Sequence, residues 1–293
     1  MPATRLTTSL GRLMINAGRW VMRYGVPAVP PRRHSIGLAL GGGFARGIAH
    51  VGVLRVFEEN SIPIAAISGV SAGAIAAAAF ASGVPTSEIE KLAAVMRFRD
   101  VARLTVSRMG LVSSERMQAF LQRLLAVTRF EEMKIPLAIV ATDLRTGEPR
   151  VFRGPGDVIA PIRASCSYPG LFLPLEIEGR YLVDGAISTD VPSQAARDLR
   201  ATRVVSVALP APHVINDPRN MLHVVNRCFQ ILQAQTEYSW RRYSDLVIEP
   251  DVRGFAWDAY ESAAAMIEAG RRAAEAALPS IQAWLSLGEK NRG

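Results

Sequence analysis

The pentapeptide Gly69-Val70-Ser71-Ala72-Gly73 is the feature that most constrains the fold of this chain. It lies between an apolar run at residues 64–67, typical of a buried strand, and an alanine-rich stretch typical of a buried helix. Small residues in a G-x-S-x-G pattern allow a sharp, strained turn from strand to helix. Such a turn lifts the serine Oγ above a sheet, near a helix N-terminus that favours negative charge. The pentapeptide therefore predicts a strand–turn–helix unit that presents a nucleophilic serine, although the pattern alone is only moderately specific.

A glycine-rich loop precedes this serine. An apolar run at residues 36–40 stops at Gly41-Gly42-Gly43, and Ser71 follows Gly43 by 28 residues. Glycines allow several backbone N–H groups to converge on one anion, either a dinucleotide phosphate or the oxyanion of an acyl-transfer reaction. A dinucleotide fingerprint needs glycines at its first, third and sixth positions, and in either register Phe44 or Arg46 occupies one of them. We therefore favour an oxyanion hole.

A catalytic serine needs a base, and the sequence leaves two kinds open. His213 and His223 follow Asp184, so a triad in the order serine, acid, histidine is compatible with the chain. His50 follows the glycine loop in a helical stretch and is expected to be structural. The other candidate is the carboxylate of Asp184 itself, in Asp184-Gly185-Ala186, although an Asp-Gly pair is more often a simple turn.

In this order, the glycine loop, the G-x-S-x-G pentapeptide and the D-G-A tripeptide resemble the patatin-like phospholipases. The resemblance extends over about residues 35–209, with no match for residues 1–33 and little beyond about residue 212. Further matching segments are residues 45–54, 141–144, 164–172 and 190–192. The motif residues around the candidate site are Gly41, Arg46, Gly47, Gly69, Gly73, Gly185 and Ala186.

The resemblance implies a lipid acyl hydrolase of the phospholipase A, lysophospholipase or esterase type, with a Ser–Asp dyad and no histidine. Ser71 would attack the ester carbonyl, Asp184 would take its proton, and the amides near Gly42, Gly43 and Phe44 would hold the oxyanion. No metal or organic cofactor is expected. Because an ordinary carboxylate is a weak base, we predict that burial raises the pKa of Asp184.

Two further interpretations stay open. The same acyl-enzyme could transfer its acyl group to an acceptor other than water, which would make the protein an acyltransferase. Phe44 stands where most family members have a third glycine, and a glycine-only backbone angle there would cost about 1 kcal/mol or more. This departure also allows an inactive, membrane-associated scaffold. Arg46 could bind a phosphate headgroup or brace the loop.

The fold class follows both from the resemblance and from the apolar runs. Runs at residues 36–40, 64–67, 136–141 and 204–209 alternate with helix-compatible stretches. This alternation predicts a mostly parallel sheet with helices on both faces, and the resemblance implies a three-layer α/β/α fold. Residues 61–87 carry no charge, but their prolines and glycines favour a buried strand, turn and helix over a membrane span.

The net charge of +8 belongs to the N-terminal end. No acidic residue precedes Glu58, and the eight arginines before it equal the whole excess, which argues against a nucleic-acid-binding body. Residues 1–25 place apolar residues opposite arginines at helical spacing. They could therefore bind an anionic membrane surface, pack on their own domain, or pack on a second copy in a homodimer.

We expect three parts in the chain. Residues 1–33 form the basic amphipathic segment and its proline-rich linker, residues 34–210 the catalytic domain, and residues 211–293 a helical extension packed on that domain. Two cysteines without metal-ligand spacing and no recognisable secretory signal favour a cytoplasmic protein, with peripheral membrane attachment through the first part.

Overall fold

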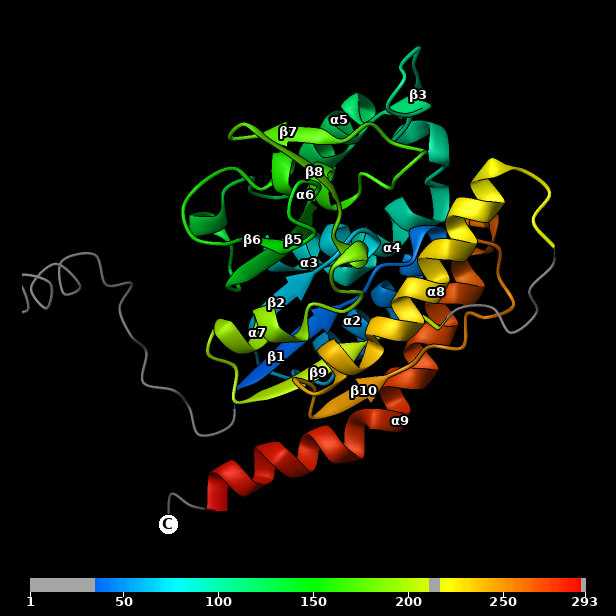
Figure 1. The fold of residues 1–293 in the computed structure, drawn as a ribbon. Coiled ribbons are helices and arrows are strands. Elements are labelled where there is room, and N and C mark those ends of the chain that lie inside the picture. Colours follow the sequence, from blue (N-terminus) through cyan, green and yellow to red (C-terminus); the bar gives the residue numbers. More distant parts are fainter. Residues whose placement is uncertain (1–34, 211–216, 291–293) are drawn as a thin grey trace, which may run out of the picture. The chain divides into compact units, whose positions relative to one another are not determined.

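A central sheet organises the fold. The computed structural model describes residues 35–210 and 217–290. Its main sheet has eight strands in the order β10-β9-β1-β2-β5-β8-β7, with β6 also paired to β5 (Figure 1). The strands are β1 (Ile36–Leu40), β2 (Ile64–Gly69), β5 (Leu137–Asp143), β6 (Pro149–Phe152), β7 (Leu175–Ile177), β8 (Arg180–Asp184), β9 (Arg203–Val207) and β10 (Leu246–Ile248). Strands β10, β9, β1, β2 and β5 run parallel to one another, whereas β6 and β8 each pair antiparallel with β5, and β7 pairs antiparallel with β8.

Helices cover both faces of this sheet. The α-helices are α2 (Ala49–Glu59), α3 (Ala72–Ala81), α4 (Thr86–Val95), α5 (Glu115–Leu124), α6 (Ile159–Ser165), α7 (Ser193–Asp198), α8 (Met221–Arg241) and α9 (Ala263–Lys290). The 3-10 turns are η1 (Phe44–Ile48), η2 (Phe98–Asp100), η3 (Phe130–Glu132), η4 (Gly185–Ile187) and η5 (Tyr260–Ser262). The charge-free stretch of residues 61–87 forms β2, α3 and the beginning of α4. In the described part of the chain, no helix combines the length and apolarity needed to cross a bilayer.

Alternation along β1 explains the layers. Leu38 and Leu40 are buried in the core that α2, α3 and α9 share, whereas Ala39 packs with Ala196 of α7 and Trp240 of α8. Because successive side chains of a strand point to opposite faces, a strand that is apolar at every position must be covered on both sides. The predicted three-layer α/β/α fold with a central, mostly parallel sheet is confirmed.

The part of the chain after residue 217 adds a strand and a long helix to this framework. Strand β10 pairs in parallel with β9 at the edge of the sheet. Helix α9 crosses α2 at two glycines: a Cβ on Gly52 would lie 1.9 Å from the carbonyl oxygen of Ile267, and one on Gly270 would lie 1.9 Å from that of Ala49. The two backbones therefore approach more closely than any side chain would permit.

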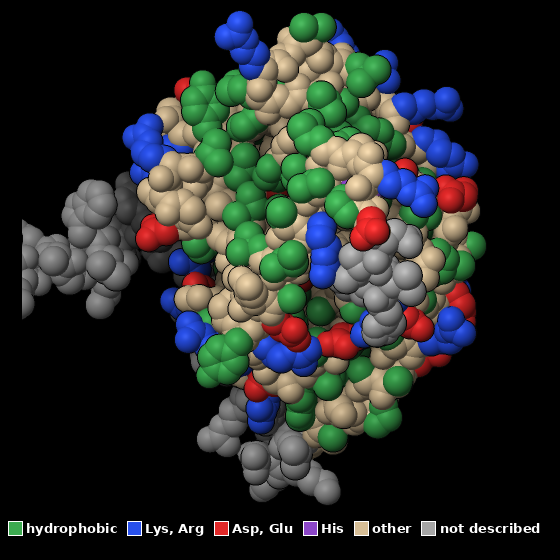
Figure 2. Space-filling model, turned by 45° about the vertical axis from the view of Figure 1, so that its right-hand side comes forward, with side chains coloured by type: hydrophobic (Ala, Val, Ile, Leu, Met, Phe, Trp, Pro, Cys, Tyr) green, Lys and Arg blue, Asp and Glu red, His purple; other side chains and the backbone are tan. Residues whose placement is uncertain are grey.

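A small hairpin lies apart from the main sheet. Its strands β3 (Arg103–Leu104) and β4 (Val112–Ser113) pair antiparallel. It lies at the end of the molecule that is uppermost in Figures 1 and 2, where Figure 2 shows hydrophobic side chains at the surface with Lys and Arg side chains beside them.

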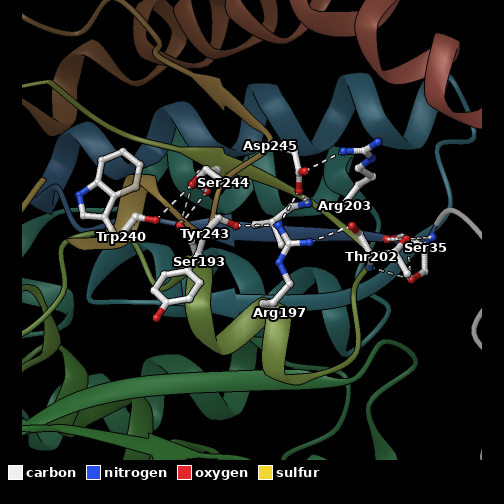
Figure 3. A network of polar contacts seen from close by, with 11 residues as sticks. Ser35, Ser193, Arg197, Thr202, Arg203, Trp240, Tyr243, Ser244 and Asp245 are labelled. Carbon is white, nitrogen blue, oxygen red and sulfur yellow. Dashed lines mark hydrogen bonds and ion pairs between the residues drawn. The ribbon is translucent and has the colours of Figure 1, made fainter. Parts of the chain in front are cut away.

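A polar network fastens the β10 edge of the sheet (Figure 3). The carboxylate of Asp245 pairs with Arg197 of α7 at 2.6 Å and with Arg203 of β9 at 2.9 Å, and it accepts the Val204 N–H at 2.7 Å. Although burial alone raises the pKa of Asp245, the Val204 amide and the two arginines lower it overall. Asp245, directly before β10, thereby ties α7 and β9 to the edge strand.

Candidate active site

The candidate nucleophile and base come from two strands that approach each other along one edge of β5. Strand β2 runs parallel to β5 and pairs Gly69 with Ile139, whereas β8 runs antiparallel and pairs Asp184 with Ala141. Strand β6 pairs with the same residues of β5 along the opposite edge. The C-terminal ends of β2 and β8 therefore face each other across two residues of β5. Ser71, two residues beyond β2, meets the last residue of β8.

Ser71 occupies the turn between β2 and α3 in a backbone conformation that L-residues rarely adopt, with φ 53° and ψ −125°. The neighbouring glycines make this turn possible. A Cβ on Gly69 would lie 2.5 Å from the Gly73 carbonyl oxygen, and one on Gly73 would lie 2.2 Å from that of Leu40. The strand-to-helix turn predicted from the pentapeptide is thus present, with the serine at its apex.

The Ser71 hydroxyl is hydrogen-bonded directly to Asp184. Its Oγ donates to Asp184 Oδ2 at 2.7 Å, while Oδ1 accepts the Ala186 N–H at 3.0 Å. Both residues are buried, with exposed fractions of 8% for Ser71 and 2% for Asp184. Burial raises the pKa of Asp184 to about 7; the Ala186 amide and the Ser71 hydroxyl oppose this rise, and the nearby Asp190 adds to it. The direction agrees with the pKa predicted from the sequence.

The two described histidines do not hydrogen-bond to Ser71 or Asp184. His50 is buried, its Nε2 lies 2.8 Å from the Gly41 carbonyl oxygen, and burial lowers its pKa to about 4, so the ring is neutral and donates this bond. His223 lies in the first turn of α8, where its backbone N–H donates to Asn220 Oδ1 at 2.9 Å. His213 lies outside the described residues.

The glycine loop lies beside the nucleophile. A Cβ on Gly42 would lie 3.6 Å from Ser71 Cβ and 3.3 Å from Ala186 Cβ. The Gly42 N–H donates to the Asp190 carbonyl oxygen at 3.2 Å, and Gly41 N–H donates to that of Val207 at 3.0 Å. Within the described residues, the N–H groups of Gly43 and Phe44 have no acceptor. The loop therefore offers two unoccupied amides for an anion.

Phe44 adopts the left-handed backbone conformation that glycine usually supplies, with φ 50°. Its ring packs edge-to-face against Tyr168, with centroids 4.7 Å apart, and against Trp257 at 5.2 Å. The loop thus requires the unusual angle, and an aromatic cluster holds the non-glycine residue in it.

The other motif residues support the site by close approach or by burial. A Cβ on Gly47 would lie 2.3 Å from Ala72 Cβ, and one on Gly185 would lie 2.1 Å from the Val140 carbonyl oxygen. Arg46 is buried and its Nη1 donates to the Pro210 carbonyl oxygen at 3.1 Å. These contacts fix the glycine loop against α3, the turn after β8 against β5, and Arg46 against the segment after β9.

Two site residues have roles that the sequence did not reveal. Ser165, in α6, accepts the Ser71 N–H at 2.8 Å and donates its own hydroxyl to the Val140 carbonyl oxygen at 2.6 Å, which fixes the strained turn. The Asp190 side chain accepts a hydrogen bond from Gln233 of α8 at 2.5 Å, and burial raises its pKa to about 7. Both residues lie in segments that carry the family resemblance, but the sequence motifs do not indicate the hydrogen-bond partner of either one.

An apolar cleft opens from Ser71. It contains about 820 Å³ of empty space, part of it open to solvent. Its walls come from η1, α2, α3, α4, η2 and α5 and from the segments that follow η2 and α6, and they include Phe44, Ile75, Leu92, Phe98, Val101, Phe120 and Phe172. Within residues 35–210 and 217–290, no cluster of three or more His, Cys, Asp or Glu side chains could hold a metal ion. The cleft suits an extended apolar group whose reactive end reaches Ser71.

Comparison with known proteins identifies the family. A family model described as patatin-like phospholipase matches residues 38–197. The chain belongs to the patatin-like phospholipase family. Two uncharacterised NTE family proteins of Mycobacterium tuberculosis are similar to it. One is 35% identical over 178 residues, covering 59% of this chain and 49% of its own. The other is 30% identical over 273 residues, covering 83% of this chain and 46% of its own.

This patatin-like chain therefore spans about half the length of the curated relatives it matches. Among solved structures, VipD from Legionella pneumophila is similar in fold, with a TM-score of 0.51 and 16% identity. That alignment covers 85% of this chain and 67% of VipD. The likeness supports the three-layer fold.

Proposed function

We propose that this patatin-like protein is a lipid acyl hydrolase that cleaves a carboxylic ester bond through an acyl-enzyme on Ser71. The observation that carries the proposal is the 2.7 Å hydrogen bond between Ser71 Oγ and a buried Asp184 whose pKa is raised to about 7. A base with a pKa near neutrality combines a populated carboxylate with useful proton affinity. Substrate class is inferred from the family and from the apolar cleft beside the serine.

In the acylation step, Ser71 Oγ attacks the ester carbonyl carbon while its proton passes to Asp184 Oδ2. The carbonyl oxygen becomes an oxyanion, and the unoccupied amides of Gly43 and Phe44 are the donors we assign to it. The Gly42 amide donates to the backbone carbonyl oxygen of Asp190, so it helps to position the loop instead. When the tetrahedral intermediate collapses, the carbon–oxygen bond to the alcohol breaks and Asp184 returns the proton to the leaving alkoxide.

Deacylation repeats these steps with water. Asp184 takes a proton from the water that attacks the acyl carbon, and returns it to Ser71 Oγ as the acid leaves. The acyl chain would lie in the apolar cleft, where each buried CH₂ contributes about 0.8 kcal/mol of binding. An alcohol in place of water would complete an acyl transfer, so the acceptor alone separates hydrolase from transferase.

Labelling by a fluorophosphonate probe and release of p-nitrophenol from short and long acyl esters test this proposal. Ser71→Ala and Asp184→Asn should each abolish ester release, and Ser71→Ala should also abolish labelling. His213→Ala and His223→Ala serve as controls and should retain activity. Loss of activity in a histidine variant that still folds would favour a serine–acid–histidine triad over the dyad. Absence of labelling in the wild type would favour the inactive scaffold.

Product analysis in the presence of a lysolipid or an alcohol separates the two enzymatic outcomes. Free fatty acid as the sole acyl product supports the hydrolase. A new ester formed in proportion to the added acceptor would support the acyltransferase.

We further propose that residues 1–25, which lie outside the described residues, attach the protein to anionic membranes. Support for this comes from their arginines and their helical apolar spacing. Deletion of residues 1–33 should weaken sedimentation with anionic liposomes. Equal binding with and without the segment would contradict the proposal.

A further inference from the structure

The β3–β4 hairpin exposes large apolar side chains to solvent. Leu104 is 84% exposed, Val106 is fully exposed, Met109 is 56% exposed and Leu111 is 42% exposed. Single exposed apolar residues are ordinary, but four within one short hairpin concentrate apolar side chains in the way that marks a binding site. This apolar tip, residues 104–111, has no partner among the described residues that would cover it.

The segment that contains the apolar tip is rich in arginine. Residues 97–123 contain six arginines but only two acidic residues, Asp100 and Glu115. Glu115 pairs with Arg103 at 3.0 Å. Arg99, Arg116 and Arg123 line a pocket between η2 and α5, the elements that precede and follow the hairpin in the chain, together with Asp100 and Ala119. The segment therefore combines apolar side chains with a positive rim, which matches the headgroup region of an anionic bilayer.

The base of the hairpin is built into the wall of the cleft. Val112 N–H donates to the Leu171 carbonyl oxygen at 2.9 Å, and Leu173 N–H donates to that of Val112 at 3.0 Å. Phe172, between these two residues, packs edge-to-face against Phe98 with centroids 6.0 Å apart. Phe98, Val101 and Phe172 all line the cleft that reaches Ser71. A lipid held at the hairpin would therefore be next to the acyl-binding cleft.

We propose that the β3–β4 hairpin and its arginines are a docking surface for an anionic lipid bilayer, separate from residues 1–25. The apolar tip enters the headgroup boundary, and the arginines lie against lipid phosphates. A second copy of this chain is a poorer occupant, because a symmetric contact would place two arginine-rich rims against each other. The inference rests on the proposed hydrolase activity for its purpose, but the docking can be measured without catalysis.

Vesicle binding tests the surface directly. Full-length Ser71→Ala protein, which leaves the lipid intact, is sedimented with vesicles of phosphatidylcholine alone or with phosphatidylglycerol added. Each large apolar side chain that leaves water changes partitioning about tenfold. The double variant Val106→Asp/Met109→Asp should therefore bind the anionic vesicles at least tenfold more weakly than the parent protein. The control Leu144→Asp/Met221→Asp alters two other exposed apolar residues and should bind as the parent does.

A local probe keeps the test independent of residues 1–33. In a Cys228→Ser background, Val106→Cys or Leu144→Cys is labelled with an environment-sensitive nitrobenzoxadiazole dye. Anionic vesicles should increase and blue-shift the emission at position 106 and leave position 144 unchanged. Sedimentation of the protein without a change at position 106 would overturn the proposal, as would absence of sedimentation.

A self-association that Val106→Asp/Met109→Asp abolishes, seen by analytical ultracentrifugation without lipid, would also overturn it, in favour of a second copy. The proposed function is tested separately. Val106→Asp/Met109→Asp should hydrolyse a soluble short-chain ester at the wild-type rate but hydrolyse vesicle phospholipid at least tenfold more slowly. If the wild type hydrolyses neither, the proposed function fails while the docking result still holds.

Discussion

Phe44 offers a sharp test of the glycine-loop geometry, because its backbone and its side chain affect stability in opposite directions. The backbone lies at φ 50°, where a Cβ is unfavourable, while the ring packs against Tyr168 and Trp257. Phe44→Ala removes the ring and keeps the strain. Phe44→Gly removes both and restores the residue that most members of the family have.

The magnitudes follow from these two contributions. Removal of a fully buried Phe costs about 3–5 kcal/mol, and Phe44 is only partly buried, so Phe44→Ala should cost about 2–3 kcal/mol. At a left-handed backbone angle, glycine relieves about 1–2 kcal/mol of strain relative to alanine. Its greater freedom in the unfolded chain offsets about 0.5–1 kcal/mol of that gain. Phe44→Gly should therefore be about 0.5–1 kcal/mol more stable than Phe44→Ala, and still less stable than the wild type.

Urea unfolding of the three proteins, followed by circular dichroism, measures both differences. If Phe44→Gly is the least stable of the three, Phe44 does not occupy the left-handed region. If Phe44→Ala matches the wild type, the aromatic contacts contribute nothing, and the reasoning about the ring is wrong.

Three further perturbations follow from contacts in the described residues. The kcat/KM for a soluble ester should rise with pH through an apparent pKa of about 7, because Asp184 must be ionised to act as base. Asp190→Asn should lower that apparent pKa, because it removes a nearby negative charge. A midpoint near pH 4 in the wild type would contradict the assignment of Asp184 as base. Asp245→Asn should lower the free energy of unfolding by about 1–2 kcal/mol at pH 7, since both arginine partners are partly screened by solvent. The folded pKa of Asp245 lies below its unfolded value of about 3.9, so the difference from wild type in urea unfolding should shrink as pH falls through the folded pKa. Gly52→Ala and Gly270→Ala should each lower the free energy of unfolding by about 1–3 kcal/mol in the same assay, because each added Cβ pushes α2 away from α9. The double variant should lose less than the sum of the two, since both substitutions act on the same helix contact, and full additivity would indicate independent sites.

The parts of the fold that the sequence predicts are those that short-range rules determine. The apolar runs predict the central strands, and the small residues around Ser71 predict the strand-to-helix turn, because each depends on neighbours within a few positions. The antiparallel return of β8 onto β5 is different. It brings Asp184 to a serine 113 residues away, a pairing that no local pattern contains. The resemblance to a family supplied the pairing, and the geometry agrees with it.

The same dependence on local patterns explains why the sequence did not predict the role of Ser165 or the β3–β4 hairpin. Ser165 supports the Ser71 turn through one hydroxyl, and a buried serine in α6 looks like any other helix residue in the sequence. The β3–β4 hairpin has strands of two residues each, too short for an alternating pattern, so neither its existence nor its exposed apolar tip could be predicted.

The two carboxylates near the glycine loop, the buried Asp184 and the half-buried Asp190, differ in their partners, and this difference bears on which of them can act as the base. Among the described residues, no arginine or lysine forms an ion pair with Asp184, whose oxygens accept only from Ser71 and the Ala186 amide. Arg46 instead acts on Asp190, where its charge opposes the rise in pKa that burial causes. A cation beside Asp184 would lower its pKa and weaken it as a base. The charge of Arg46 acts on Asp190, whereas Asp184 is bonded to the serine, and this difference favours Asp184 as the carboxylate that accepts the Ser71 proton.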